Sequence, residues 1–222
     1  MTFSSVLFDL DGTILDTADD LGAALNFVLA KHGKTAVSAD CYTPEASNGS
    51  KGLLKLGFGE AFIGYDFEVL KAELLQYYCA NIAVHTDFFA GVTDALNHLN
   101  QNNIPWGIVT NKPAFLTEPL LTHYPEFAHC RTVVSGDTLK VAKPSPEPLL
   151  YGLNEMDASF AQGCPASGCL YVGDALRDIE AGRNAGMKTA AALYGYIADG
   201  DDVDSWGADY HFDSLLELVE LM

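Results

Sequence analysis

The chain has 222 residues and a formal net charge of −18 at pH 7, and 49% of its residues are hydrophobic. This length and composition predict one domain, or one domain with an insert, around a packed core. The charge excludes nucleic acid and anionic membranes as expected partners, because both repel an acidic protein. No apolar run reaches the roughly 18 residues of a membrane span. We therefore expect a cytoplasmic protein, either a monomer or a homodimer.

The first predicted strand covers residues 6–11, where a short apolar run ends on Asp9 and Asp11. Alternation of side chains along a strand would bring both carboxylates to the same side, with Cα atoms about 7 Å apart. From residue 17 to about residue 85, apolar residues recur at spacings of three and four, which predicts helices. No convincing strand interrupts this stretch, so an all-helical insert is expected to follow the first strand.

After about residue 87 the pattern changes to alternating helices and strands. Strands are predicted at 105–110, 131–136, 169–174 and 188–193, and helices at 91–103, 114–124, 145–156, 176–186 and 214–222. This alternation predicts an α/β fold, in which a Rossmann-like parallel sheet carries helices on both faces. We expect the α/β core to consist of residues 1–16 and 86–222, and the insert of residues 17–85.

Polar and charged side chains gather where four of these segments end, which is where sites form in parallel sheets. They are Asp9, Asp11, Thr110, Asn111, Lys143, Asp174 and Asp178. Each has a plainer interpretation when taken alone, since an Asp at a strand–helix junction is commonly an N-cap and a single Lys is commonly solvated. A cap, however, explains one acid and not the pair that ends the first strand.

Four carboxylates that meet at one point require a cation, and ligands that are all oxygen suit Mg²⁺. The ion, together with Lys143, Thr110 and main-chain N–H groups, would form a pocket for a phosphate dianion. One Asp would then be placed for in-line attack, and its neighbour would manage protons. The pattern therefore predicts phosphoryl chemistry at the edge of the sheet.

The segments DLDGT, VTN, KP and GDALRD resemble, in this order, the four motifs of the haloacid dehalogenase superfamily, and the resemblance covers essentially the whole chain. It implies that Asp9 is the nucleophile and forms an aspartyl-phosphate. Asp11 would protonate the leaving alcohol and then activate water. The implied Mg²⁺ ligands are Asp9, the main-chain carbonyl of Asp11, Asp174 and, directly or through water, Asp178. The implied phosphate-binding residues are Thr110, Asn111 and Lys143.

Within the superfamily, the stretches WGIVTNKP, KPSPEPL and YGYI with WGAD are similar to bacterial phosphoglycolate phosphatases, and especially to the subgroup assigned to N-acetylmuramic acid 6-phosphate phosphatase. The implied reaction is hydrolysis of a small phosphorylated metabolite, either 2-phosphoglycolate or N-acetylmuramic acid 6-phosphate. The insert resembles the α-helical cap of the family, where we expect substrate choice. Its candidate contacts with a substrate carboxylate are Asn48, Gly49, Ser50 and Lys51, with Lys51 as a solvated helix residue the plainer alternative.

Two other functions fit parts of the same pattern. A sugar phosphomutase on this scaffold would return the phosphoryl group to a sugar and not to water. A phosphorylatable receiver module also gathers Asp, Thr and Lys around Mg²⁺. The length of this chain, its helical insert and the second acid placed two residues after the first argue against a receiver. The five cysteines show no CxxC and no zinc spacing, so we expect reduced thiols, with a pairing of Cys164 and Cys169 left open.

Overall fold

The computed structural model describes residues 3–158, 164–198 and 200–222. The chain divides into two compact units, one formed by Met1–Leu15 with Phe88–Met222 and the other by Asp16–Asp87. The chain passes from one unit to the other at β2 (Leu15–Asp16) and returns at β3 (Asp87–Phe88), and these two short strands pair with each other. The first unit carries the sheet and the second carries the helical insert.

A six-stranded parallel sheet with the order β5-β4-β1-β6-β7-β8 forms the first unit. Its strands are β1 (Ser5–Phe8), β4 (Trp106–Val109), β5 (Val133–Val134), β6 (Cys169–Gly173), β7 (Lys188–Ala192) and β8 (Tyr210–Phe212). Every residue of β1, β4 and β6 is buried, as expected for continuous apolar strands covered on both faces. The predicted α/β fold with a parallel sheet and a helical insert is confirmed.

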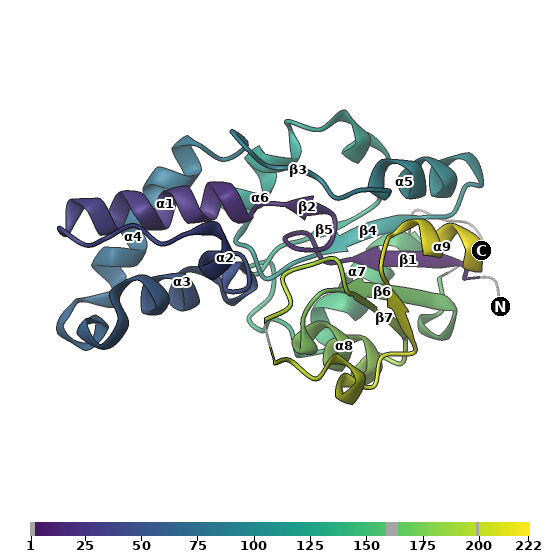
Figure 1. The fold of residues 1–222 in the computed structure, drawn as a ribbon. Coiled ribbons are helices and arrows are strands. Elements are labelled where there is room, and N and C mark those ends of the chain that lie inside the picture. The colour runs from purple at the N-terminus through teal and green to yellow at the C-terminus, as the bar shows by residue number, and fades with distance from the viewer. Residues whose placement is uncertain (1–2, 159–163, 199) are drawn as a thin grey trace. The chain divides into compact units, whose positions relative to one another are not determined.

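Helices cover both faces of this sheet, with α7 and α8 on one face and α5 and α9 on the other (Figure 1). The helices of this unit are α5 (Val92–Gln101), α6 (Ala114–Leu121), α7 (Glu147–Ala158), α8 (Leu176–Asn184) and α9 (Leu216–Leu221). In the pairing register, Phe8 lies between Ile108 and Val172. The segments that leave the carboxyl ends of β1, β4 and β6 are therefore neighbours in space.

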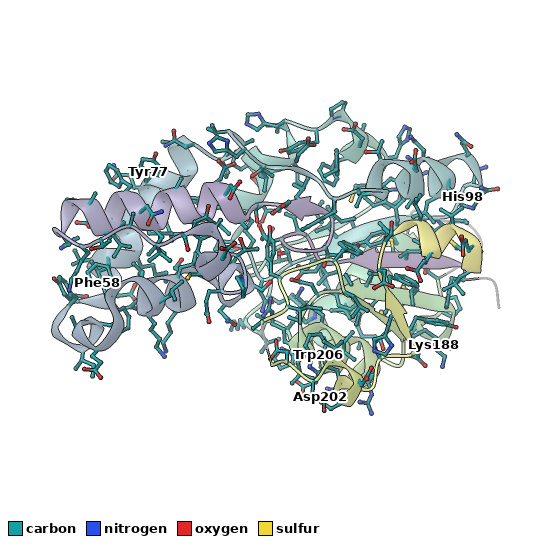
Figure 2. The ribbon with its side chains drawn as sticks, viewed as in Figure 1. Phe58, Tyr77, His98, Lys188, Asp202 and Trp206 are labelled. Carbon is teal, nitrogen blue, oxygen red and sulfur yellow. The ribbon has the colours of Figure 1, made fainter. Side chains whose placement is uncertain are left out.

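The second unit contains only helices among the regular elements of residues 17–85. They are α1 (Ala18–Lys31), α2 (Ala39–Tyr42), α3 (Gly49–Phe58) and α4 (Phe67–Ala80), joined in part by short 3₁₀ turns. The helix α1 packs against α3 and α4. The Phe58 ring, labelled in Figure 2, meets the rings of His32 and Tyr65 edge-on, and Leu25, Leu53 and Leu74 are fully buried. The unit therefore has an apolar core of its own.

The first strand is shorter than predicted. It ends at Phe8, because the carbonyl of Leu10 accepts hydrogen bonds from the N–H groups of Thr13, Ile14 and Leu15 at 3.3, 3.0 and 3.0 Å and so closes a turn. The strand β8 and the short pair of β2 and β3 were not predicted. None of the five cysteines forms a disulfide, so Cys164 and Cys169 are not bonded to each other. Within the described ranges, no helix has the length and apolar character to cross a membrane.

Candidate active site

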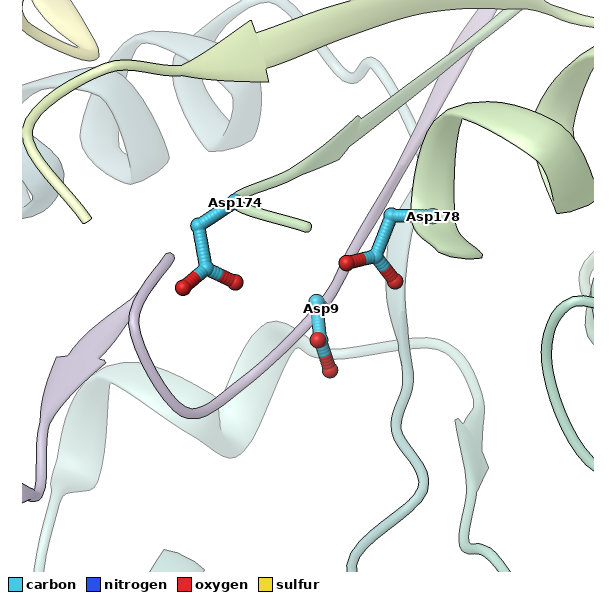
Figure 3. Close-up of side chains that lie close together, drawn as sticks. All are labelled: Asp9, Asp174 and Asp178. Atoms are coloured by element: carbon cyan, nitrogen blue, oxygen red, sulfur yellow. The ribbon is translucent and has the colours of Figure 1, made fainter. Parts of the chain in front are cut away.

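Three buried carboxylates meet at the carboxyl edge of the sheet. Asp9 follows β1, Asp174 follows β6 and Asp178 lies in the first turn of α8 (Figure 3). One oxygen from each lies within 4.8 Å of the others, and the three residues are only 3%, 1% and 0% exposed. The three carboxylates lie close together because β1 and β6 are parallel, so the segments that follow both strands leave the sheet at the same edge.

Each carboxylate is oriented by hydrogen bonds from the protein. Asp9 Oδ1 accepts from the main-chain N–H of Leu10 at 2.8 Å. Asp174 Oδ2 accepts from the N–H of Tyr196 at 3.0 Å, and Asp178 Oδ2 accepts from the N–H of Ala175 at 3.1 Å. Within residues 3–158, 164–198 and 200–222, no hydrogen bond reaches Asp9 Oδ2. That oxygen is therefore the one best placed to meet a ligand.

Lys143 lies against two of the three carboxylates. Its Nζ atom is 2.9 Å from Asp9 Oδ1 and 2.7 Å from Asp178 Oδ1, and its side chain is fully buried. The third hydrogen of the ammonium goes to the hydroxyl of Tyr171 at 2.8 Å. A buried ammonium is costly unless it is paired and hydrogen-bonded, and here all three of its hydrogens have acceptors.

Burial and the neighbouring charges shift the pKa values of the groups around this cluster. Burial raises the pKa of Asp178, with a further increase from Asp9, while Lys143 opposes the change. The pKa of Tyr171 lies well above its usual range because the phenol is buried beside Asp178 and Asp9. Burial acts to lower the pKa of Arg177, but Asp178, Asp9 and Asp174 together raise it. The site thus carries an excess of negative charge at short range.

Glycines allow the chain to approach the carboxylates closely. Gly12 has a φ of +80°, and a Cβ atom added there would lie 2.1 Å from Asp174 Oδ2. A Cβ atom at Gly173 would lie 2.4 Å from Asp178 Cβ, and one at Gly195 would lie 2.4 Å from Asp174 Cβ. Side chains at these three positions would displace the carboxylates, and at Gly12 the positive φ also favours glycine.

The carboxylate of Asp11 lies apart from this cluster. The sequence pattern predicted that four carboxylates meet, whereas the structure brings together three and leaves the Asp11 side chain paired with Lys112, at 2.9 Å between Oδ1 and Nζ. The turn after Phe8 is the physical reason, because the alternation of side chains holds only while the chain is a strand. The main-chain carbonyl that the family resemblance assigns to the metal is a separate group of Asp11.

Thr110 and Asn111 follow β4, beside Asp9. The hydroxyl of Thr110 accepts from the N–H of Lys112 at 3.2 Å, and the residue is buried. The amide of Asn111 is engaged twice with the main chain of Lys143: Oδ1 accepts from its N–H at 3.0 Å, and Nδ2 donates to its carbonyl at 3.1 Å. In this arrangement the Asn111 side chain holds the main chain of Lys143.

The candidate residues of the insert lie around the start of α3. This helix begins at Gly49, which has a φ of +63°, and Lys51 is exposed in its first turn. The side chain of Asn48 donates to Glu45 Oε2 at 3.0 Å. The carboxylate of Glu45 therefore lies beside Asn48, just before the start of α3, and Ser50 is half-buried.

The three carboxylates fit a divalent cation. They are oxygen donors within reach of one another, they are buried, and Lys143 is paired with Asp9 and Asp178. Hard divalent ions prefer this donor set, and a bound ion would balance the remaining negative charge. The residues present are therefore a site for a divalent metal ion.

Comparison with known proteins defines the class to which the fold and this site belong. The model of the haloacid dehalogenase-like hydrolase family matches residues 6–192. The chain is therefore a member of the haloacid dehalogenase-like hydrolases, as the four motifs indicated. This family assignment decides against the phosphorylatable receiver module.

Curated relatives match over nearly the whole chain. An N-acetylmuramic acid 6-phosphate phosphatase of Pseudomonas putida is 38% identical over 222 residues, covering 100% of this chain and 97% of the relative. A phosphoglycolate phosphatase of Xanthomonas campestris pv. campestris is 40% identical over 205 residues, covering 92% and 90% of the two chains. These relatives confirm the expected class of enzyme, a phosphoric monoester hydrolase of this family.

A solved structure supports the fold. It is the crystal structure of a predicted phosphoglycolate phosphatase from Haemophilus somnus 129PT, and it superposes on this chain with a TM-score of 0.86 at 24% sequence identity. The superposition covers 100% of this chain and 98% of that chain. At this level of identity the likeness concerns the fold alone.

Two residues of the site were not singled out from the sequence. Lys112 belongs to the quoted stretch VTNKP, but a Lys in a loop after a strand has no feature that distinguishes it from a solvated one. Tyr171 lies inside an apolar strand, where an aromatic residue is commonly part of the core. Only the pairing of β1 with β4 and β6 brings both side chains to the acidic residues.

Proposed function

We propose that this phosphatase uses Mg²⁺ and Asp9 to hydrolyse a small phosphorylated metabolite that also carries a carboxylate, with 2-phosphoglycolate and N-acetylmuramic acid 6-phosphate as the two candidates. The observation that carries the proposal is the buried cluster of Asp9, Asp174 and Asp178 with Lys143. The names of the two full-length relatives supply the candidate substrates.

Asp9 is the proposed nucleophile. The N–H of Leu10 and the ammonium of Lys143 both bind its Oδ1 atom, which leaves Oδ2 as the oxygen without a donor among the described residues. An oxygen of Asp9 would attack phosphorus, and the bond from phosphorus to the leaving alcohol would break. Asp11 would give its proton to the departing oxygen, so that the products are the alcohol and an aspartyl-phosphate.

Water would then complete the reaction. Asp11, now a carboxylate, would take a proton from a water molecule that attacks phosphorus. The bond between phosphorus and Asp9 would break, which releases inorganic phosphate and restores both acids. The ion, held by Asp9, Asp174, Asp178 and the main-chain carbonyl of Asp11, would neutralise the charge of the phosphoryl oxygens.

Lys143 and Thr110 are the proposed side-chain contacts with the phosphoryl group. Lys143 already uses its three hydrogens, so a phosphoryl oxygen would reach it only by replacing one acceptor. Asn111, whose amide holds the main chain of Lys143, would support this contact indirectly. The α/β core, formed by residues 1–16 and 86–222, would thus bind the phosphoryl group. The insert of residues 17–85 would act as the cap that binds the rest of the substrate.

A screen of phosphorylated metabolites for release of phosphate tests this proposal. We expect one of the two candidates to have the highest kcat/KM, loss of turnover in chelator, and recovery with Mg²⁺. Full turnover in chelator would contradict the metal assignment. A sugar phosphomutase would instead isomerise a sugar phosphate and release little phosphate, so measuring both products separates the two functions.

A further inference from the structure

The two buried lysines of the site serve different carboxylates. Lys143 is paired with Asp9 and Asp178, whereas Lys112 is paired with Asp11, at 2.9 Å between Nζ and Oδ1. The side chains of Lys112 and Asp11 are 6% and 16% exposed, so this pair is largely withdrawn from water. A pair in such a place is held more firmly than a surface ion pair, because little solvent competes for either partner.

The main chain of Lys112 is fixed on both sides. Its N–H donates to Thr110 Oγ1 at 3.2 Å, and its carbonyl accepts from the N–H of Gly136 at 2.8 Å and from Thr117 Oγ1 at 3.2 Å. Gly136 approaches so closely that a Cβ atom there would lie 2.1 Å from the carbonyl oxygen of Asn111. The lysine therefore extends from a rigid support after β4, on the strand next to β1.

The main chain around Asp11 is also fixed. The N–H of Gly12 donates to the carbonyl of Leu15 at 3.0 Å, and Asp11 forms a β-bridge with Leu15. Since the backbones of both partners are held, the bond from Lys112 to Oδ1 restricts the rotation of the Asp11 carboxylate. The other charged groups of the described site are mostly carboxylates, which would repel Asp11 if Lys112 were absent.

We propose that Lys112 is a positioning residue, which holds the Asp11 carboxylate in the orientation required for proton exchange with the leaving group and with water. The inference rests on the proposed function, in which Asp11 is the acid and base. Lys112 itself neither attacks phosphorus nor transfers a proton. Its effect should therefore appear only in steps that use Asp11, and it should vanish when Asp11 no longer carries out those steps.

The test is a double-mutant cycle with Lys112→Met, Asp11→Asn and the double variant, measured as the rate of alcohol release in a single turnover. One substrate is the more active of the two candidate alkyl phosphates, and the other is p-nitrophenyl phosphate, whose leaving group needs little protonation. General acid–base catalysis contributes about 10²–10⁴-fold. We expect Lys112→Met to lower the rate of alcohol release at least about tenfold on the alkyl phosphate and much less on p-nitrophenyl phosphate. In the Asp11→Asn background, Lys112→Met should cause no further loss of rate.

Controls separate positioning from stability. Lys140→Met removes the same charge from an exposed site and should leave both rates unchanged. Lys112→Arg keeps the cation and should recover part of the lost rate on the alkyl phosphate. If Lys112→Met alone is poorly folded, the double variant and Lys112→Arg still test the positioning role, because the double variant leaves neither charge unpaired.

The outcomes are distinct. Equal losses on both substrates, or an undiminished effect of Lys112→Met in the Asp11→Asn background, would overturn the positioning role. If Asp11→Asn itself slows both substrates alike, the assignment of Asp11 in the proposed function fails first. If the loss of rate depends on the leaving group for Asp11→Asn but not for Lys112→Met, only the inference on Lys112 is overturned.

Discussion

The hydroxyl of Tyr171 accepts a hydrogen bond from Lys143 Nζ at 2.8 Å and donates one to the carbonyl oxygen of Val109 at 3.0 Å. Tyr171 is fully buried in the central strand β6, and its hydroxyl also lies 3.3 Å from Asp178 Oδ1. A side chain of the hydrophobic core thus fixes the ammonium that contacts two of the acidic residues. The core of the sheet and the site are one connected structure.

We expect Tyr171→Phe to weaken the site and the fold together. The change removes a hydroxyl, leaves the Val109 carbonyl and one Lys143 hydrogen without partners, and should cost about 1–3 kcal/mol of unfolding free energy. A looser Lys143 should raise KM and the inhibition constant of inorganic phosphate. Tyr194→Phe is the control, since its hydroxyl donates to the carbonyl of Thr13 at 3.0 Å and does not touch Lys143. A similar rise in both constants in the control would contradict the role given to Tyr171.

The close approach of Gly12 to Asp174 leads to a second prediction. Gly12→Ala should displace the Asp174 carboxylate, since the new Cβ atom would lie 2.1 Å from Oδ2, and should weaken Mg²⁺ activation by about tenfold or more, as loss of a metal-site interaction does. The measurement is a titration of activity with Mg²⁺. Gly33→Ala is a matched control, because Gly33 also has a positive φ, of +66°, but nothing lies within 4 Å of its added Cβ. It should lose about 1–2 kcal/mol of stability and keep its metal response.

Much of the fold and of the site could be predicted from the sequence, for identifiable reasons. Strands that are buried on both faces are short apolar runs, and residues just beyond them in a parallel sheet share one edge. This is why Asp9, Asp174 and Asp178 could be predicted to meet. The strand β8 was missed because Tyr210–Phe212 is short and carries His211, so it has no continuous apolar run.

The placement of Asp11 required the three-dimensional structure. The prediction extended the first strand to Asp11, whereas the Leu10 carbonyl closes a turn that redirects the chain after Asp9. The buried state of Lys112 depends on the segment that follows β1 and on the segment around Gly136, and both lie far from Lys112 in the sequence. The pairing of the Asn111 amide with the main chain of Lys143 likewise joins residues that lie 32 positions apart. Local patterns contain no information on such tertiary pairings.

The third prediction concerns substrate choice. If Lys51 binds the carboxylate of the substrate, Lys51→Ala should raise KM for the preferred metabolite by about tenfold or more, since a hydrogen bond to a charged group contributes about 1.5–3 kcal/mol. It should leave p-nitrophenyl phosphate nearly unchanged, because that compound has no carboxylate. Lys55→Ala, one turn further along α3 and also exposed, makes the same change in charge. Equal effects of the two variants, or of the two substrates, would assign Lys51 to the solvated surface of the helix.

The fourth prediction is that Asp9→Asn abolishes turnover, because an amide cannot serve as the attacking group. Asp9 is buried and paired with Lys143, so the loss of this charge also removes one partner of the ammonium. A thermal unfolding measurement should therefore accompany the assay, to show that the variant is folded. A folded variant with a tenth of the original rate would contradict the covalent mechanism.

The most direct test of covalent catalysis by Asp9 is to trap the phosphorylated carboxylate. The enzyme is mixed with Mg²⁺ and substrate, quenched during turnover and reduced with borohydride, which converts an aspartyl-phosphate into homoserine. Tandem mass spectrometry of the digested protein then reads the residue at position 9. We predict homoserine there, only when substrate is present. Rapid turnover with an unmodified Asp9, or with the modification on another carboxylate, would contradict the assignment of Asp9 as the nucleophile.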